Sequence, residues 1–229
     1  MATWQATHPE YEIKRWSTEN FDIDSVPYVK EAFEAHKWAF AADYIRMYAL
    51  YTEGGIYLDS DVILLKKMDS FLHHSFFSSM EYHPAQIEKC NSLSHLDADG
   101  HRIDDVFVEG IQIQAAVMGA EAGSPFVKKV LDWYQDKHFV KDDGTLRTDV
   151  LSPYIYARVA EELGFVYKDI EQQLPGGVHI YPSEIFAGNK HEVTSQSYAI
   201  HMCAHSWHLS PWEKIRRFLG IRKNYSQTK

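Results

Sequence analysis

The chain lacks several features that would direct its interpretation elsewhere. It contains two cysteines, Cys90 and Cys203, among 229 residues, too few for a disulfide scaffold, which fits a reducing compartment. No apolar stretch approaches the roughly 20 residues that a membrane-spanning helix needs. The formal net charge is −9, which argues against binding to a nucleic-acid backbone. We therefore expect a cytoplasmic protein that does not bind nucleic acid.

Familiar short catalytic and zinc-binding motifs are also missing. The sequence has no phosphate-binding P-loop, no Gly-x-Ser-x-Gly nucleophile elbow, no Cys-x-x-Cys and no His-Glu-x-x-His. The adjacent His73 and His74 do not indicate a zinc site, because neighbouring residues cannot share one helix face. The hydrophobic content of 45% with 14% aromatic residues is typical of a globular chain. We predict one domain over residues 1–210 and a basic tail over 211–229.

What the chain does have is an apolar strand that runs into two carboxylates. Residues 54–62 read Gly-Gly-Ile-Tyr-Leu-Asp-Ser-Asp-Val. Asp59 and Asp61 are two residues apart, so in extended backbone they point the same way. A divalent cation with oxygen ligands would relieve their repulsion. The alternative for this tripeptide alone is a polar turn with two solvated aspartates.

The segment before this strand predicts a helix. Residues 38–52 are rich in alanine and other good helix formers, and Gly54-Gly55 suits the helix stop. Asp43 and Arg46 are three residues apart and share a face of that helix. They form either a surface ion pair or, because unpaired charge is costly in a mostly apolar helix, the wall of a polar pocket.

Taken together, residues 39–51 and 54–62 closely resemble glycosyltransferase family 32, the family with the DXD sugar-binding region. Further segments are similar to the same family, namely residues 115–121, 124–126, 180–184, 198–201 and 206–207. The resemblance implies an α/β fold of GT-A type, a mixed sheet flanked by helices. It also implies a nucleotide-sugar donor, a divalent metal such as Mn²⁺ or Mg²⁺, and retention of anomeric configuration.

The resemblance also implies roles for the residues of the central block. Asp43 would hold hydroxyl groups of the donor sugar, and Arg46 would bind the sugar or the diphosphate. Asp59 would contact ribose, sugar or metal, and Asp61 would be the principal metal ligand. Asp43, Arg46 and Asp61 are thus the expected catalytic residues.

Near the C-terminus, the resemblance implies a segment that closes the site. His201 or Ser206 would complete the metal shell, and Trp207 would reach the diphosphate. Many family members carry His-His where this chain has His201-Met202, with His205 nearby. Which of His201, His205 and Ser206 binds metal therefore stays open.

The chain departs from the family pattern elsewhere. Ala42 replaces a serine that often precedes the helix aspartate, and Ala115 stands where asparagine is frequent, with Gln112 or Gln114 as substitutes. The family's opening strand, of the type Ile-Pro-Lys-Ile-Ile-His, has no counterpart, and residues 8–16 match its second strand. We therefore expect an N-terminally short domain.

Other segments give local expectations. A helix is predicted near 28–36, and Ser-Pro pairs at 124–125 and 152–153 predict helix starts, with helix ends near 136 and 163–164. Residues 90–105 read as a long loop, either a lid or acceptor element or a variable surface insert. The tail is either an anchor that touches the inner face of the membrane or a solvated basic segment.

The resulting functional hypothesis is a metal-dependent retaining hexosyltransferase. It would move a sugar from a nucleotide-sugar donor to a glycan or lipid-linked acceptor, in the synthesis of bacterial surface polysaccharide such as capsule. The alternative is a catalytically silent sugar- or nucleotide-binding module that keeps the fold.

Overall fold

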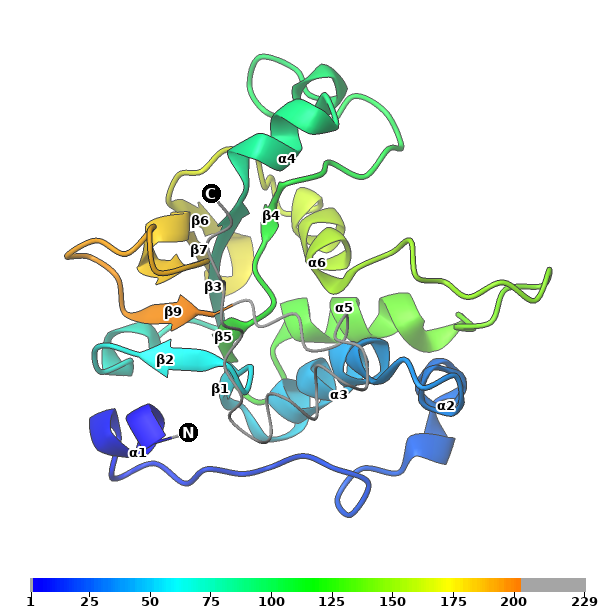
Figure 1. The fold of residues 1–229 in the computed structure, drawn as a ribbon, viewed down its shortest axis with the longest axis horizontal. Helices are drawn as coiled ribbons and strands as arrows, with labels where there is room; N and C mark the ends of the chain where they lie inside the picture. The colour runs from blue at the N-terminus through cyan, green and yellow to red at the C-terminus, as the bar shows by residue number, and fades with distance from the viewer. Residues whose placement is uncertain (1, 203–229) are drawn as a thin grey trace, which may run out of the picture.

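The computed structural model describes residues 2–202, which form an α/β structure with a mixed sheet flanked by helices (Figure 1). The expected α/β fold class is therefore confirmed. Cys203, His205, Ser206, Trp207 and the tail over 211–229 lie outside the described residues. Within residues 2–202, no helix is both long and apolar enough to cross a membrane.

The N-terminal quarter is helical except for one long extended segment. Its elements are α1 (Ala2–Thr7), the 3₁₀ helix η1 (Ile23–Ser25), α2 (Pro27–Glu34) and α3 (Trp38–Glu53). The helices predicted near 28–36 and over 38–52 are both present. The strand expected within residues 8–16 is wrong, since residues 8–22 contain neither helix nor strand. This segment has no backbone ladder with another strand among the described residues, and a strand without a partner is not stable.

The main sheet has the order β1-β5-β3-β7-β6, and β4 pairs with β3 as well. Its strands are β1 (Gly55–Leu58), β3 (Phe76–Tyr82), β4 (Ile111–Ile113), β5 (Val117–Ala120), β6 (Gln172–Leu174) and β7 (Val178–Tyr181). β5 runs antiparallel to both β1 and β3, while β3 and β7 are parallel. Consequently β1, β3 and β7 all run in one direction, and their carboxyl ends meet at one edge of the sheet.

A second sheet of three strands has the order β2-β9-β8. It consists of β2 (Val62–Leu64), β8 (Phe186–Ala187) and β9 (Ala199–His201). β9 is antiparallel to β2 and parallel to β8. Because β2 begins directly after the Asp59–Asp61 turn, this small sheet carries β9 to the DXD motif.

The remaining helices include α4 (Pro84–Lys89), α5 (Pro125–Gln135) and α6 (Ser152–Glu161), with the 3₁₀ helices η2 (Asp69–Phe71), η3 (Ser92–His95), η4 (Pro175–Gly177) and η5 (Ser183–Ile185). Ser124 is the N-cap residue of α5, as predicted. The expectation for Ser152 is wrong in detail, because α6 begins at Ser152 and Leu151 is its N-cap residue. The Ser152 hydroxyl bonds elsewhere, as described below.

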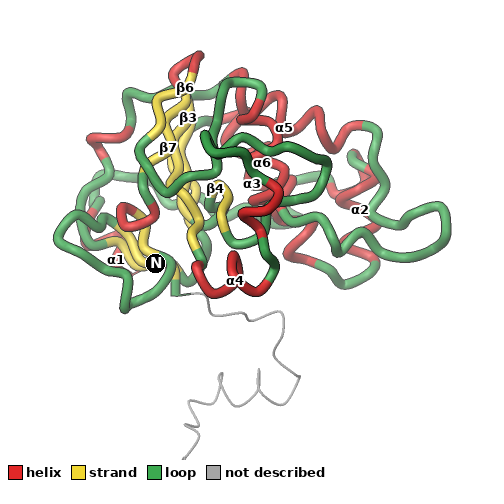
Figure 2. Tube along the Cα trace, turned by 90° about the horizontal axis from the view of Figure 1, so that it is seen from above, coloured by secondary structure: helices red, strands yellow, loops and turns green. Residues whose placement is uncertain are grey.

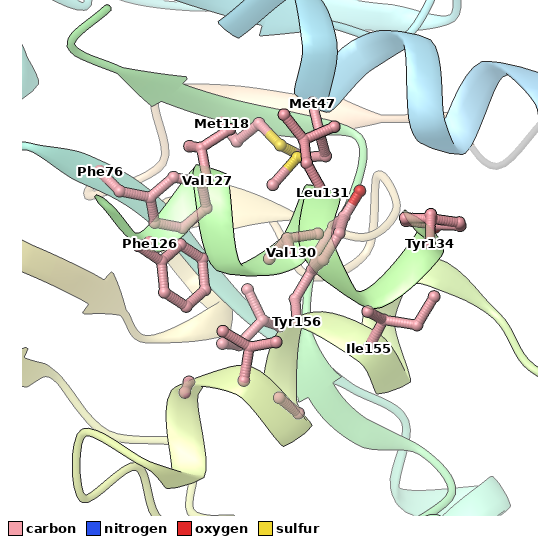
Figure 3. Packing of buried hydrophobic residues seen from close by; sticks show 14 of the residues in the cluster. Met47, Phe76, Met118, Phe126, Val127, Val130, Leu131, Tyr134, Ile155 and Tyr156 are labelled. Atoms are coloured by element: carbon pink, nitrogen blue, oxygen red, sulfur yellow. The ribbon is translucent and has the colours of Figure 1, made fainter. Parts of the chain in front are cut away.

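Helices cover one face of the main sheet and the small sheet covers the other (Figures 1 and 2). On the helical side, α3, α5 and α6 pack their apolar residues against β3, β4 and β5. Figure 3 shows this core around Met47, Phe76, Met118, Phe126 and Tyr156. On the other side, Phe77 and Val117 pack against β2, β8 and β9. Burial on both faces holds the main sheet firmly in place.

Two glycines are required by close packing near the site. Gly54 ends α3 with a φ of 70°, and a Cβ atom there would lie 2.8 Å from the Ala122 nitrogen. Gly119 has no special φ, but a Cβ atom would lie 2.2 Å from the Phe77 ring. A side chain at either position would push apart the elements that carry the DXD motif.

Candidate active site

The DXD turn is fixed by hydrogen bonds at both ends. The Asp59 amide donates to the Ala116 carbonyl at 2.9 Å, which extends the pairing between β1 and the chain leading into β5. The Val62 amide donates to the Asp59 carbonyl at 3.0 Å and closes the turn. Both carboxylates are therefore held at the carboxyl end of β1 by backbone contacts.

β9 brings an imidazole to this turn. Its register with β2 pairs His201 with Val62, the residue that follows Asp61. His201 Nε2 lies 3.4 Å from Asp61 Oδ1 and 3.9 Å from Asp59 Oδ2. One ligand atom from each of these residues can be chosen so that all lie within 4.8 Å of one another. The two aspartates and the histidine thus form a compact group of candidate metal ligands.

Arg46 connects helix α3 to the DXD strand. Its Nη2 atom lies 3.0 Å from Asp43 Oδ1, and its Nη1 atom lies 3.7 Å from Asp59 Oδ1. Nη1 also donates to the Ala115 carbonyl at 2.7 Å, and the guanidinium lies over the Tyr57 ring, 4.9 Å from its centroid. Burial lowers the pKa of Arg46, but these anionic and polar neighbours outweigh it and raise that pKa. The guanidinium therefore stays charged although it is largely buried.

Asp43 is held by two donors, Arg46 and the hydroxyl of Ser152, which donates to Asp43 Oδ1 at 2.9 Å. The Asp43 side chain is 13% exposed, which excludes the alternative of a solvated surface pair. Burial raises the pKa of Asp43 to about 6, although Arg46 and the Ser152 hydrogen bond lower it. No hydrogen bond from residues 2–202 reaches the other oxygen, Oδ2, and Asp43 lines the cleft described below.

Tyr57 gives the two Asp59 oxygens different surroundings. Its hydroxyl donates to Asp59 Oδ1 at 2.6 Å, on the side of Arg46. The other oxygen, Oδ2, faces His201. Asp59 Oδ1 is thus held by contacts within the protein, and Asp59 Oδ2 is one of the candidate metal-ligand atoms.

Five of the predicted site residues come together in space: Asp43, Arg46, Asp59, Asp61 and His201. Tyr57, Ser152 and the Ala115 carbonyl were not predicted from the sequence. Tyr57 could have been found, because it lies two residues before Asp59 on the same strand face. Ser152 is 109 residues away from Asp43, and no local signal connects them.

These residues line a large open cleft with a volume of about 2370 Å³. Pockets for single small ligands typically measure about 300–1,000 Å³. The cleft is thus large enough to take two substrates side by side. Trp38 lines it at the start of α3, and Trp16 lines it beside Tyr48 of the same helix. Residues of β3 and β4 line it as well.

The Asp59, Asp61 and His201 group fits a divalent cation. Two ligands on opposite sides of an ion, each about 2.1 Å away, would be about 4.2 Å apart. The 3.4 Å and 3.9 Å separations from His201 Nε2 lie below this limit. Carboxylate oxygens suit Mg²⁺ and Mn²⁺, and an imidazole nitrogen suits transition metals. The separations between His201 and the two aspartates are therefore short enough for these residues to share one cation.

Comparison with known proteins places this geometry in context. Residues 1–78 match the family model described as the glycosyltransferase sugar-binding region containing the DXD motif. Inositol phosphoceramide mannosyltransferases 2 and 3 of Schizosaccharomyces pombe are 37% and 34% identical to this chain over 71 residues. Each alignment covers 29% of this chain and about a fifth of the yeast protein, 21% and 20% respectively.

Among solved structures, the PaToxG glycosyltransferase is similar at a TM-score of 0.38 with 18% identity. The superposition covers 66% of this chain and 46% of that protein. A similarity this low assigns neither activity nor substrate.

The matched region ends at residue 78, so it contains Asp43, Arg46, Asp59 and Asp61 but not His201. The other segments that resemble the family, over 115–121, 124–126, 180–184, 198–201 and 206–207, lie beyond it. The string from Asp43 to Asp61 is therefore the part of the resemblance that the comparisons support. Over residues 1–78, about a third of its length, this chain is similar to the glycosyltransferases whose sugar-binding region contains the DXD motif.

Proposed function

We propose that this chain is a metal-dependent glycosyltransferase that binds a nucleotide-sugar donor at the DXD motif. The observation that carries the proposal is the convergence of Asp59, Asp61 and His201 beside the buried Asp43–Arg46 pair. A structural ion pair alone would not need the adjacent metal-ligand group. The proposal also includes retention of anomeric configuration, which the family resemblance implies.

Asp61, His201 and the Oδ2 oxygen of Asp59 would hold the cation, Mn²⁺ or Mg²⁺. A divalent cation in such a site neutralises negative charge on a departing nucleoside diphosphate. Arg46 would add a fixed positive charge on the opposite side, already oriented by Asp43 and the Ala115 carbonyl. Preorganised charge of this kind often contributes most of the rate enhancement of an enzyme, because it needs no rearrangement during the reaction.

Asp43 would orient the donor sugar. Its Oδ2 oxygen is available to accept a hydrogen bond from a sugar hydroxyl, while Oδ1 is held by Arg46 and Ser152. A carboxylate fixed at one oxygen positions its ligand more precisely than a freely rotating one. Since ionised Asp43 is the better acceptor, its raised pKa predicts that donor binding weakens as the pH falls through about 6.

The names of the yeast relatives suggest the first substrates to test. Mannose is the first sugar to test as part of the donor, and a phosphorylated inositol is one class of acceptor to test. We also propose that the protein acts in the synthesis of bacterial surface polysaccharide, with a glycan or lipid-linked acceptor. The alternative is a catalytically silent module that binds a sugar or a nucleotide.

A direct test combines donor hydrolysis with calorimetry. GDP-mannose, UDP-glucose and UDP-galactose are incubated with the protein and Mn²⁺, and released nucleotide is measured. Binding of Mn²⁺ and of the donor is then measured for Asp61→Ala. Glu88→Ala, which removes an exposed carboxylate on α4, is the matched control.

We expect manganese-dependent hydrolysis of at least one donor, lost in Asp61→Ala and kept in Glu88→Ala. Unchanged manganese and donor affinity in Asp61→Ala would refute the metal assignment. Donor binding without hydrolysis, or without transfer to any acceptor, would favour the silent binding module.

A further inference from the structure

A second group of polar side chains lies at the same edge of the main sheet as the DXD motif. β1 and β3 run in one direction on either side of β5, so the two strands lie about 10 Å apart. Asp59 and Asp61 follow the carboxyl end of β1, whereas Glu81 and His83 stand at the carboxyl end of β3. In open α/β sheets, ligands bind at the carboxyl ends of strands.

Four residues form what we call the carboxylate wall: Glu81, His83, Glu109 and Glu192. His83 Nε2 lies 3.0 Å from Glu81 Oε1, and this hydrogen bond raises the pKa of His83, to which Glu192 also contributes. Glu192 Oε2 accepts from the Gly188 amide at 3.1 Å. Glu109 accepts from Gln86 Nε2 at 2.9 Å. All four wall residues line the cleft that also contains Asp59 and Asp61.

Gln114 supplies an independent sign that a ligand belongs here. The residue is 5% exposed and lines the same cleft. Its Nε2 atom donates to the Phe186 carbonyl at 2.6 Å and to Ser79 Oγ at 3.2 Å, which fixes the orientation of the amide. Its Oε1 oxygen has no hydrogen-bond partner within the described part of the chain. A buried carbonyl oxygen without a donor is unfavourable, and a ligand hydroxyl would satisfy it.

Charge is distributed unevenly along the cleft. Every lysine and arginine among its described lining residues lies between residues 14 and 46. The lining residues from 80 onward include three glutamates but, among those described, no lysine or arginine. Even with His83 protonated, the carboxylate wall keeps a net negative charge. A ligand with an anionic group beside this wall would be repelled. Such repulsion between like charges lets a binding site discriminate strongly against anionic ligands.

We propose that the carboxylate wall and Gln114 form the acceptor end of the cleft and select an uncharged, polyhydroxylated acceptor over a phosphorylated one. Carboxylates, imidazole and an amide oxygen accept hydrogen bonds from sugar hydroxyl groups, whereas phosphate oxygens offer them none. The inference rests on the proposed glycosyltransferase function and narrows its acceptor to a neutral glycan. It argues against the phosphorylated inositol class.

The test uses two probes that differ only in the phosphate, methyl α-D-mannopyranoside and its 6-phosphate. Binding of each probe to the full chain with Mn²⁺ is measured by saturation-transfer NMR, which needs no turnover. Transfer to each probe is measured with the donor that the hydrolysis screen identifies. The compared proteins are the wild type, Glu81→Gln/Glu192→Gln, and Glu88→Gln as the charge control outside the cleft.

We expect the wild type and Glu88→Gln to prefer the neutral probe by at least roughly tenfold. Removal of two wall charges should reduce this preference by roughly tenfold, because repulsion of the phosphate is relieved. The preference is a ratio within one protein, so effects on the donor cancel. Equal binding of the two probes, binding of neither, or an unchanged ratio in the double variant overturns the inference.

The outcomes separate this inference from the proposed function. Selective binding of the neutral probe by a protein that hydrolyses no donor supports the acceptor site while refuting the transferase. Donor hydrolysis with no preference between the probes supports the transferase and refutes the acceptor site.

Discussion

Replacement of Asp43 by asparagine should change how stability depends on pH. Asp43 has a folded-state pKa of about 6 against an ordinary value of 3.8. The folded protein therefore holds this proton more tightly than the unfolded chain. Such a group favours the folded state at low pH, and its contribution is lost as the pH rises from about 4 to about 6. An asparagine side chain does not titrate, so this contribution to the pH dependence of stability is absent from Asp43→Asn.

The magnitude follows from the two pKa values. A shift of one unit corresponds to about 1.4 kcal/mol, so the full effect is about 3 kcal/mol. Of this, about 2 kcal/mol falls between about pH 4.5 and about pH 7.5. The free energy of unfolding of the wild type should drop by that amount relative to Asp43→Asn over this range. The pairing of ionised Asp43 with Arg46 is already contained in this pKa. The remaining difference, between protonated Asp43 and asparagine, adds an offset that does not depend on pH.

Urea denaturation of both proteins across this pH range measures the difference directly. Asp136→Asn, which removes an exposed carboxylate at the end of α5, controls for loss of a charge. Activity of Asp43→Asn should be lost at every pH if the carboxylate orients the donor. If the difference in unfolding free energy between the wild type and Asp43→Asn is the same at every pH from about 4.5 to about 7.5, the pKa of Asp43 is not raised by burial.

Three further substitutions test the side-chain hydrogen bonds to Asp43, Glu161 and Asp59. Ser152→Ala removes the hydrogen bond to the Asp43 carboxylate and should lower the free energy of unfolding by about 1.5–3 kcal/mol at neutral pH. The loss should be smaller near pH 5, and urea denaturation at both pH values measures it. Arg102→Ala breaks the paired contact with Glu161 that ties the 90–105 segment to α6, and a loss of about 2–3 kcal/mol of unfolding free energy is expected. Proteolysis within residues 90–105 should become faster, and unchanged cleavage would show that other contacts hold this segment. Tyr57→Phe removes the hydroxyl that donates to Asp59, so calorimetry should find weaker manganese-dependent binding of the nucleotide sugar, with a stability loss of about 1.5–3 kcal/mol.

Local signals in the sequence were sufficient for the elements that carry the site. Residues 38–52 combine helix formers with a glycine stop, and α3 indeed ends at Glu53 with Gly54 as its cap. The period-two relation of Asp59 and Asp61 lies within one strand and one turn. These features depend on interactions within a few residues, which composition and spacing record directly.

Expectations that depended on distant partners were less successful. Residues 8–16 match a family strand, but strand formation depends on a neighbour that the pattern itself does not specify. Ser152 precedes a proline and so reads as an N-cap, yet its hydroxyl bonds to Asp43 from the first position of the helix. The Arg46 contact with Ala115 spans 69 residues and uses a backbone carbonyl, which no side-chain motif can report.

The position of Arg46 supports the proposal that a cation binds beside Asp61 and not beside Asp43. Arg46 Nη2 lies 3.0 Å from Asp43 Oδ1, and its Nη1 lies 3.7 Å from Asp59 Oδ1. The guanidinium thus supplies positive charge at the Asp43 end of the site, whereas ligand atoms of Asp59, Asp61 and His201 converge at the other end. A divalent cation bound there would be the largest local charge at that end. The substrate diphosphate would then meet positive charge from Arg46 on one side and from the metal on the other.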